Sequence, residues 1–335
     1  MTRRRAGRAG WAAAAAVLLA VAGLWWMWRP AGARRPAAIV EIPAGASRWQ
    51  IAQRLAAAGV VRSAAGFEAW CVLHPGQTLK AGAYRFTGGE SVSRVFDVLA
   101  RGAVYTIAVT VPEGYNRFDI ARELARLGLA RPSVFLAATA NPAAIRDLDP
   151  AAVSLEGYLF PATYPISPHT PVARIIAMMT GRFREEARLD GVAPPGIHAW
   201  VTLASLVEKE TAVAAERPLI AGVFGNRLRL GLPLQCDPTV IYAALLAHRY
   251  TGAIHRSDLA FASPYNTYLH TGLPPGPIAN PGRASLLAAE HPAHTPYLYF
   301  VNDGHGGHRF ARTLAGQERN VRRYLRARRD GRGLR

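Results

Sequence analysis

The chain has 335 residues, half of them hydrophobic, with 31 glycines and 24 prolines. This composition excludes an intrinsically disordered chain, and the length is sufficient for two packed domains. The net charge of +18 suggests a nucleic-acid partner, but 14 of these charges lie in residues 1–35 and 319–335, and the body has no basic stripe interleaved with aromatic residues, which argues against a nucleic-acid groove.

The first predicted element is a membrane anchor at residues 11–28. This run of 18 residues has no charged side chain, has arginine-rich flanks and carries three tryptophans near its end. As a helix it spans roughly 27 Å, close to the hydrocarbon thickness of a bilayer, with the tryptophans at the interface. A cleaved signal peptide is the alternative, because residues 31–33 offer a small-residue cleavage site. We expect residues 1–10 to form a basic cytoplasmic stub.

An internal repeat with a constant offset of 69 residues follows. Residues 42–59 align with residues 111–128, and the matched positions include a Pro-x-Gly turn and a set of apolar residues at helical spacing. Each copy therefore predicts a strand, a turn and an amphipathic helix that ends at glycine. Between the copies, residues 82–86 predict a strand and residues 91–99 a helix. Small α+β modules of this kind either bind polymers or act as spacers, and the sequence leaves both roles open.

Beyond residue 151 the sequence predicts longer helices separated by loops rich in proline and aromatic residues. The expected elements are helices at 198–215, 219–230 and 237–246, a β-hairpin built from 297–301 and 308–310, and a final helix from Leu314. The predicted fold class is therefore α+β.

Glu208 is the predicted catalytic residue. In the helix over residues 198–215 it shares a face with small and apolar side chains, whereas Glu210 points to nearly the opposite side. The residues of that face are Val201, Ala204, Ser205, Thr211, Ala212 and Ala215. Apolar surroundings favour the protonated form of a carboxyl group, which a general acid needs. The alternative is a structural carboxylate satisfied by an arginine.

The cysteines and histidines do not predict a metal site. Cys71 and Cys236 have no partners at zinc-site spacing and are expected to be buried free thiols, a disulfide between them being the alternative. Asp303, His305 and His308 have a spacing that suggests metal binding, but the glycines between the histidines predict a hairpin tip, where side chains diverge. We expect neither a metal nor an organic cofactor.

Four segments of the second half are distinctive: LASLVEKET at 203–211, DPTVIY at 237–242, YNTY at 265–268 and GLPPG at 272–276. In this order they closely resemble the endolytic murein transglycosylase family, the MltG or YceG-like proteins. The resemblance covers residues 37–325, with departures at Ala162 and Cys236.

The resemblance implies a single-pass inner-membrane protein with its body in the periplasm. The parts after the anchor are then a LysM-like module at 37–106, a second repeat-like module at 107–150, a catalytic domain at 151–325 and a basic tail at 326–335. The implied partners are peptidoglycan glycan strands, peptidoglycan synthases and the inner membrane.

The resemblance also implies a reaction, in which Glu208 is the acid/base that cuts the bond between N-acetylmuramic acid and N-acetylglucosamine in nascent strands. The same carboxylate would then take the proton of the muramic C6 hydroxyl, which closes a 1,6-anhydro ring. The residues predicted to bind substrate are Ser205, Gln235, Asp237, Asn266 and Tyr268.

Two alternative functions stay open. A hydrolytic muramidase needs a second carboxylate, for which Glu216 and Asp237 are the candidates. A non-catalytic peptidoglycan-binding or division-scaffold protein would use Glu208 only structurally.

Overall fold

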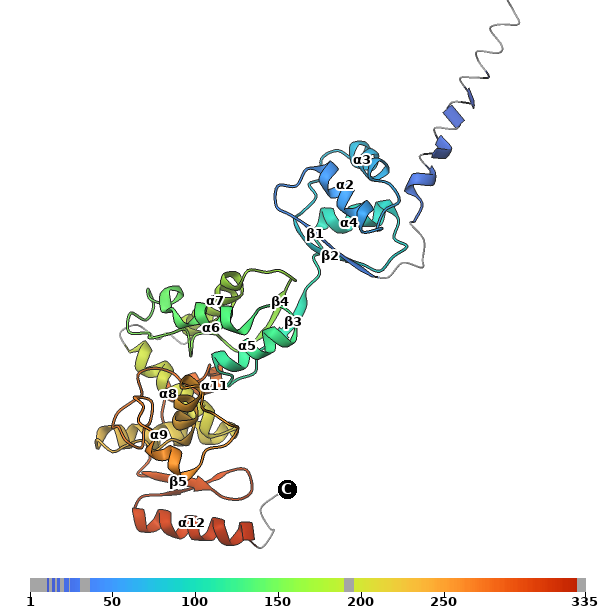
Figure 1. Cartoon of the computed structure of the whole chain (residues 1–335). Helices are drawn as coiled ribbons and strands as arrows, with labels where there is room; N and C mark the ends of the chain where they lie inside the picture. The colour runs from blue at the N-terminus through green and yellow to red at the C-terminus, as the bar shows by residue number, and fades with distance from the viewer. Residues whose placement is uncertain are drawn as a thin grey trace, which may run out of the picture. The chain divides into compact units, whose positions relative to one another are not determined.

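The computed structural model describes residues 37–189 and 196–329, together with residues 11, 14–15, 17–18, 21–23 and 25–30. The chain divides into two compact units (Figure 1). Unit 1 comprises Met1–Ile107 and Pro165–Pro168, and unit 2 comprises Ala108–Tyr164 and His169–Arg335. Both units combine helices with short strands, so the fold is of the predicted α+β class.

Unit 1 is a small module of helices packed on a two-stranded sheet. Its elements are β1 (Ala38–Ile42), α2 (Arg48–Ala57), α3 (Ala64–Leu73), β2 (Gly82–Phe86) and α4 (Val92–Arg101). Strands β1 and β2 are antiparallel, with Val40 opposite Tyr84. The inward faces of the sheet and helices form one core around Leu55, Phe67 and Leu99, each fully buried.

The two copies of the repeat form the same local structure. Strand β3 (Ile107–Thr110) and helix α5 (Arg117–Arg126) correspond to β1 and α2 at the offset of 69 residues. Both helices begin with a capping box, formed by Ser47 with Gln50 in the first copy and by Asn116 with Asp119 in the second. The repeat therefore extends to the capping residues, although their side chains differ.

Unit 2 contains the remaining elements, except that Ile107 and Pro165–Ile166, at the ends of β3 and β4, belong to unit 1. Strand β4 (Thr163–Ile166) forms a two-stranded sheet with β3, and β5 (Tyr299–Asn302) forms an antiparallel one with β6 (His308–Ala311). The helices after α5 are α6 (Pro132–Ala140), α7 (Val172–Leu189), α8 (Ile197–Glu210), α9 (Arg217–Arg229), α10 (Asp237–Leu246), α11 (Arg283–Glu290) and α12 (Leu314–Arg329). Three 3₁₀ turns complete it: η1 (Pro142–Ala144), η2 (Ala214–Glu216) and η3 (Arg256–Ala260).

Helices α8, α9 and α11 pack against one another and supply much of the hydrophobic core of unit 2 (Figure 1). The Trp200 indole N–H of α8 donates to the Leu286 carbonyl of α11 over 2.9 Å. The backbone at Ala293 approaches α9 so closely that position 222 has to be glycine. A Cβ on Gly222 would lie 2.3 Å from the Ala293 carbonyl oxygen. The segment that follows α11 therefore runs directly over α9 before it enters β5.

Helix α8 ends five residues earlier than predicted. Thr211 adopts an extended conformation, and its hydroxyl accepts the Val213 N–H and donates to Glu216. This local side-chain bonding competes with helix continuation. Residues 212 and 215 consequently lie outside the helix and do not belong to the face of Glu208.

The N-terminal prediction falls partly outside the described residues. Within the part of the chain that is described, no helix is long and apolar enough to cross a membrane. The predicted anchor at 11–28 and the basic tail at 326–335 both include residues outside that part. The whole stub at 1–10 lies outside it.

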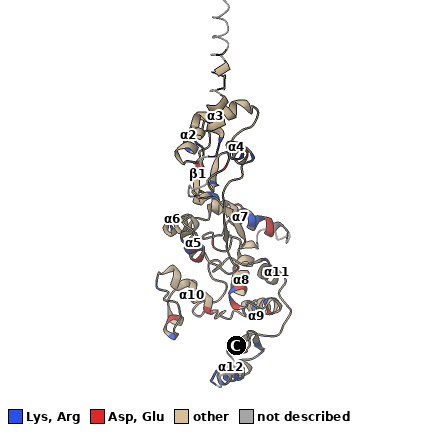
Figure 2. Cartoon of the chain, turned by 90° about the vertical axis from the view of Figure 1, so that its right-hand side faces the viewer, with Lys and Arg blue, Asp and Glu red and all other residues tan. Residues whose placement is uncertain are grey.

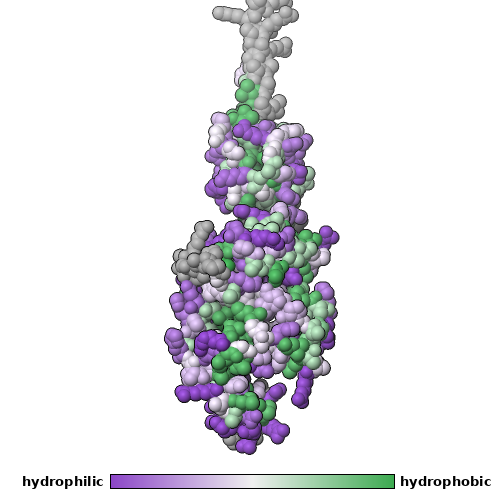
Figure 3. Space-filling model, turned by 90° about the vertical axis from the view of Figure 1, so that its left-hand side faces the viewer, coloured by the Kyte–Doolittle hydropathy of each residue, from purple (hydrophilic) through white to green (hydrophobic). Residues whose placement is uncertain are grey.

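The surface of unit 2 is mixed in character. Figure 3 shows hydrophobic patches interspersed with hydrophilic ones on the face that it displays. Helix α12 carries several exposed arginines, including Arg322, Arg323 and Arg326 (Figure 2). Its exposed charge contributes to the basic character that the composition assigned to the C-terminal region.

Candidate active site

Helix α8 carries two acidic residues at its C-terminal end, and they face different surroundings. Glu208 and Glu210 are two positions apart, so their side chains lie roughly 200° apart around the helix. The predicted opposition of the two side chains is thus retained in the folded chain. Both sides of this helix end are covered by other elements of unit 2.

Glu208 is held in a tight polar contact. Its side chain is 6% exposed and lies 3.5 Å from the Arg217 guanidinium, while its second oxygen accepts the Gly282 N–H over 3.0 Å. Both contacts stabilise a negatively charged carboxylate. The structure therefore gives Glu208 the arginine partner that the sequence left open as the structural alternative.

Glu113 is a second carboxylate beside Arg217, and the sequence did not predict it. It lies 3.9 Å from the guanidinium of Arg217, and its side chain is half exposed. Burial raises the pKa of Glu113, nearby Glu208 raises it further, and Arg217 opposes the rise. The repeat contained a signal for it, because position 44 of the first copy is alanine whereas position 113 of the second is charged.

Glu210 lies at a cavity of about 520 Å³ on the other side of the helix. The cavity is lined by Glu210, Arg227, Leu234, Gln235, Asp237, Tyr268, Leu298, Tyr299, Phe300, Val301, Asn302, His308, Leu314 and Gln317. Strand β5, helix α12 and the loop before α10 supply most of this lining, and Glu208 is not part of it.

Burial raises the pKa of Glu210 to about 7. A hydrogen bond from the Cys236 thiol opposes the rise, Asp237 adds to it and His308 opposes it. At neutral pH this carboxyl group is therefore present in both protonation states beside a cavity. A general acid needs that combination of access and proton affinity.

Three of the five predicted substrate-binding residues line the same cavity. The Tyr268 hydroxyl donates to Asp237 over 2.5 Å. Gln235 has a left-handed backbone conformation with φ of 53°, and its side-chain oxygen accepts from Arg227 over 2.7 Å. With that oxygen occupied, the Gln235 amide N–H groups are the atoms left to contact a ligand.

The other two residues are used inside the protein. Ser205 is fully buried, donates to the Thr202 carbonyl and accepts the Ile278 N–H. Asn266 is also fully buried, and its amide donates to carbonyl oxygens of the preceding loop. Both residues hold the loops that surround α8 and α10, and neither lines the cavity.

The histidines of the hairpin do not form a metal site. Asp303 accepts the backbone N–H groups of His305 and Gly307, and the His308 ring lies 2.7 Å from Glu216. Among the described residues, no cluster of three or more histidine, cysteine or acidic side chains is arranged to hold a metal ion.

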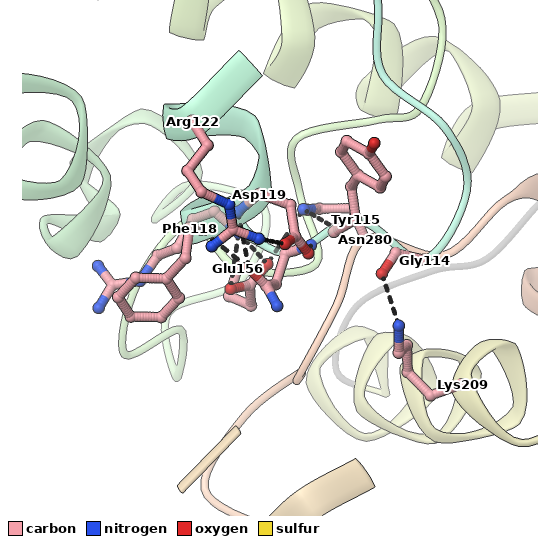
Figure 4. A network of polar contacts seen from close by, with 10 residues as sticks. Gly114, Tyr115, Phe118, Asp119, Arg122, Glu156, Lys209 and Asn280 are labelled. Atoms are coloured by element: carbon pink, nitrogen blue, oxygen red, sulfur yellow. Dashed lines mark hydrogen bonds and ion pairs between the residues drawn. The ribbon is translucent and has the colours of Figure 1, made fainter. Parts of the chain in front are cut away.

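A second buried network fixes the loops on the Glu208 side (Figure 4). Glu156 is 1% exposed and accepts the Arg117 N–H and the Asn280 amide. Asn280 in turn donates to the Tyr115 carbonyl and accepts the Leu159 N–H. These contacts join the start of α5, the loop around residue 157 and the segment before α11.

The sequence resembles characterised proteins along most of its length. The model of the YceG-like family matches residues 40–323. The endolytic murein transglycosylase of Bacillus subtilis is 35% identical over 309 residues, which cover 85% of this chain and 84% of that protein. The endolytic murein transglycosylase of Streptococcus pneumoniae strain R6 is 30% identical over 319 residues, covering 85% of this chain and 58% of that protein.

A solved structure is also similar. The crystal structure of a YceG-like protein from Listeria monocytogenes matches with a TM-score of 0.54 and 31% sequence identity. The match covers 85% of this chain and 99% of that chain.

Proposed function

The chain belongs to the YceG-like family, and from this membership we propose that it is an endolytic murein transglycosylase, a lyase whose substrate is peptidoglycan. The relatives that carry this name each match 85% of this chain, which supports the proposal. The observation that carries the proposal is the carboxyl group of Glu210, which has a raised pKa and lines a cavity with polar and aromatic walls.

In the proposed reaction Glu210 is the general acid. Its protonated carboxyl group donates to the oxygen of the bond between N-acetylmuramic acid and N-acetylglucosamine, and the bond from the muramic C1 to that oxygen breaks. The C6 hydroxyl of the same muramic residue then attacks C1 and gives its proton to a base in the cavity. One product ends in 1,6-anhydro-N-acetylmuramic acid. The other begins with an N-acetylglucosamine whose former glycosidic oxygen is now a hydroxyl group.

Glu208, which the helix face predicts to be the acid, is the alternative. Three observations favour Glu210 over it: the cavity borders Glu210, the pKa of Glu210 is raised to about 7, and Glu208 is paired with Arg217. Through its contacts with Arg217 and the Gly282 N–H, Glu208 connects α8 to the starts of α9 and α11.

The masses of the products test the proposed reaction. Uncrosslinked glycan strands incubated with the full chain should yield fragments whose new muramic ends are one water lighter than the ends made by hydrolysis. Reducing muramic ends would identify a hydrolase, for which Asp237 at the cavity is a candidate second carboxylate. Binding of strands without any cleavage would favour the scaffold alternative.

The anchor and the first module complete the proposal. Residues 11–28 anchor the chain in the inner membrane with its body in the periplasm, where peptidoglycan synthases are partners, and residues 37–106 form a LysM-like module that binds glycan. The uncharged run with flanking arginines supports the anchor. Retention of the full chain in membranes after alkaline carbonate washing is expected, and a mature N-terminus near residue 34 would contradict it.

A further inference from the structure

The proposed reaction needs a base for the proton of the C6 hydroxyl, and besides Glu210 the cavity is lined by the imidazole of His308, which is paired with Glu216. His308 begins strand β6, and Glu216 ends the turn η2 that follows α8. The two residues are 92 positions apart in the chain, and their side chains are 10% and 16% exposed. Neither belongs to the residues that the sequence assigned to substrate binding.

Glu216 fixes the His308 side chain through several contacts. One carboxylate oxygen lies 2.7 Å from the ring Nδ1, and the other accepts the backbone N–H of His308 over 2.8 Å. The Thr211 hydroxyl donates to the same carboxylate over 3.2 Å. The ring also packs edge-on against Phe300, with centroids 5.4 Å apart. The imidazole is thus confined in both position and rotation.

The contacts of Glu216 define which nitrogen of His308 carries the proton. Partial burial of Glu216 acts to raise its pKa, but the hydrogen bonds from His308 outweigh burial and leave the pKa lowered. Glu216 is therefore an ionised acceptor, so Nδ1 is the donor toward it. In the neutral ring Nε2 then has a free lone pair, and no residue of the described chain makes a hydrogen bond to Nε2.

The hairpin backbone approaches Glu216 closely at Gly307. A Cβ at Gly307 would lie 2.9 Å from Oε1 of Glu216. Because this atom is the far end of a side chain, a larger residue at position 307 would displace the Glu216 carboxylate rather than exclude the hairpin. His308 lines the same cavity as Glu210, and the two are close enough for His308 to lower the pKa of Glu210.

We propose that His308, oriented by Glu216, is the base that accepts the C6 hydroxyl proton in the reaction that Glu210 starts as acid. This inference rests on the proposed function. The Glu210 proton goes to the leaving oxygen, the C1–O bond breaks, the C6 oxygen bonds to C1, and the C6 proton passes to Nε2 of His308. Glu216 stabilises the imidazolium, which afterwards returns a proton to the Glu210 carboxylate through solvent.

This mechanism differs from one in which a single carboxylate acts first as the acid and then as the base. With two groups, the acid and the base are different side chains of the same cavity, and each can be removed alone. Glu216 is a positioning residue in this scheme, since it acts on substrate only through the imidazole.

Chemical rescue tests the role of His308. The full-chain variant His308→Ala should form anhydro ends with kcat lowered by roughly 10²–10⁴-fold and a nearly unchanged KM, as expected for the loss of a base. Added imidazole should restore part of kcat, because it fills the vacated space beside Glu216. His305→Ala is the matched control: it removes an exposed histidine of the same hairpin and should leave kcat unchanged.

The outcomes separate the two proposals. Wild-type cleavage together with a folded His308→Ala variant that keeps its kcat, or that is slow but not rescued by imidazole, would overturn the role of His308 and leave the proposed function standing. Absence of cleavage by the wild type would overturn the proposed function and the role of His308 together. If thermal melting shows that His308→Ala does not fold, His308→Gln takes its place, and a wild-type kcat in that variant would equally overturn the base assignment.

Discussion

Cys236 lowers the proton affinity of the proposed acid, against the larger effect of burial. The residue is 1% exposed, and its thiol makes a hydrogen bond to the Glu210 carboxylate that lowers the pKa of Glu210. Burial and the neighbouring Glu210 hold the pKa of Cys236 itself well above its ordinary value, so the thiol stays protonated and acts as a donor. The sequence expected a buried thiol here and assigned it no role.

Replacing Cys236 should shift the pH dependence of cleavage. Because the acid must be protonated, activity should fall as pH rises through the Glu210 pKa of about 7. Cys236→Ala removes a hydrogen bond that favours the carboxylate, so the Glu210 pKa should rise and the alkaline limb of kcat/KM should move to higher pH. Cys236→Ser keeps a donor and should leave the limb near its wild-type position. A Cys236→Ala profile identical to wild type would show that the thiol does not act on Glu210.

The catalytic residue illustrates what the sequence could and could not determine. The helix and the opposite directions of Glu208 and Glu210 follow from periodicity, which is a local property. The surroundings of each carboxylate come from segments far along the chain, Arg217 and Gly282 for Glu208 and the hairpin with His308 for Glu210. Periodicity contains no information about such contacts, so the sequence could not distinguish a paired carboxylate from one beside a cavity.

At the scale of elements, Glu156 connects helix α5 to the rest of unit 2. Both of its oxygens lie 3.1 Å from the Arg117 N–H, the first backbone donor of α5, and one accepts from Asn280 over 3.0 Å. Burial raises the pKa of Glu156 to about 7, against hydrogen bonds from Arg117 N–H and Tyr242 that lower it. Its protonation state is consequently linked to folding.

Glu156 should make the protein less stable as pH rises toward neutrality. Its pKa is raised in the folded state, so its stabilising contribution is complete below the unfolded value of about 4.5 and is lost as pH rises to about 7. The loss is about 3 kcal/mol at most. Glu156→Gln cannot ionise and should flatten this part of the stability curve in denaturant titrations at pH 5, 6, 7 and 8. Equal pH slopes in the two proteins would contradict the link.

The elements with local signals were predicted well, and those without were missed. Strand β2 has the predicted bounds and helix α10 ends at the predicted Leu246, but Asp237 lies inside α10 and not at the expected N-cap position, which Cys236 occupies without a side-chain capping bond. Helix α8 was predicted too long, because the hydroxyl of Thr211 ends it through a contact with Glu216 that the sequence pattern does not reveal. Helices α3, α6, α7 and α11 were not predicted.

At the scale of the whole molecule, the residues proposed to do chemistry all belong to unit 2. Glu210, Glu216 and His308 lie in it, and the hydrophobic core cluster of this unit shares no residue with the core of unit 1. The repeat gave the correct local structure for both copies. Unit 2 begins at Ala108, ahead of the aligned residues 111–128, and so includes the whole second copy.

Deleting residues 37–106 should separate glycan binding from cleavage. The proposed LysM-like role predicts weaker binding of the deleted chain to intact sacculi, measured by cosedimentation. Short soluble strands should still be cut, because the catalytic groups lie in unit 2. Unchanged binding to sacculi would reduce the module to a spacer.

The assignment of the general acid is the central claim, and the matched pair Glu210→Gln and Glu208→Gln tests it most directly. Both substitutions preserve side-chain size, and cleavage of uncrosslinked glycan is followed by mass for each variant and for the wild type. Glu210→Gln should remain folded while the rate of anhydro-end formation falls by roughly 10²–10⁴-fold. Glu208→Gln should lose about 2 kcal/mol of stability, because Arg217 loses the nearer and more buried of its two carboxylate partners, yet still cleave. A folded Glu210→Gln variant that cleaves at the wild-type rate, with a folded Glu208→Gln variant that does not cleave, would contradict the account and return the catalytic role to Glu208.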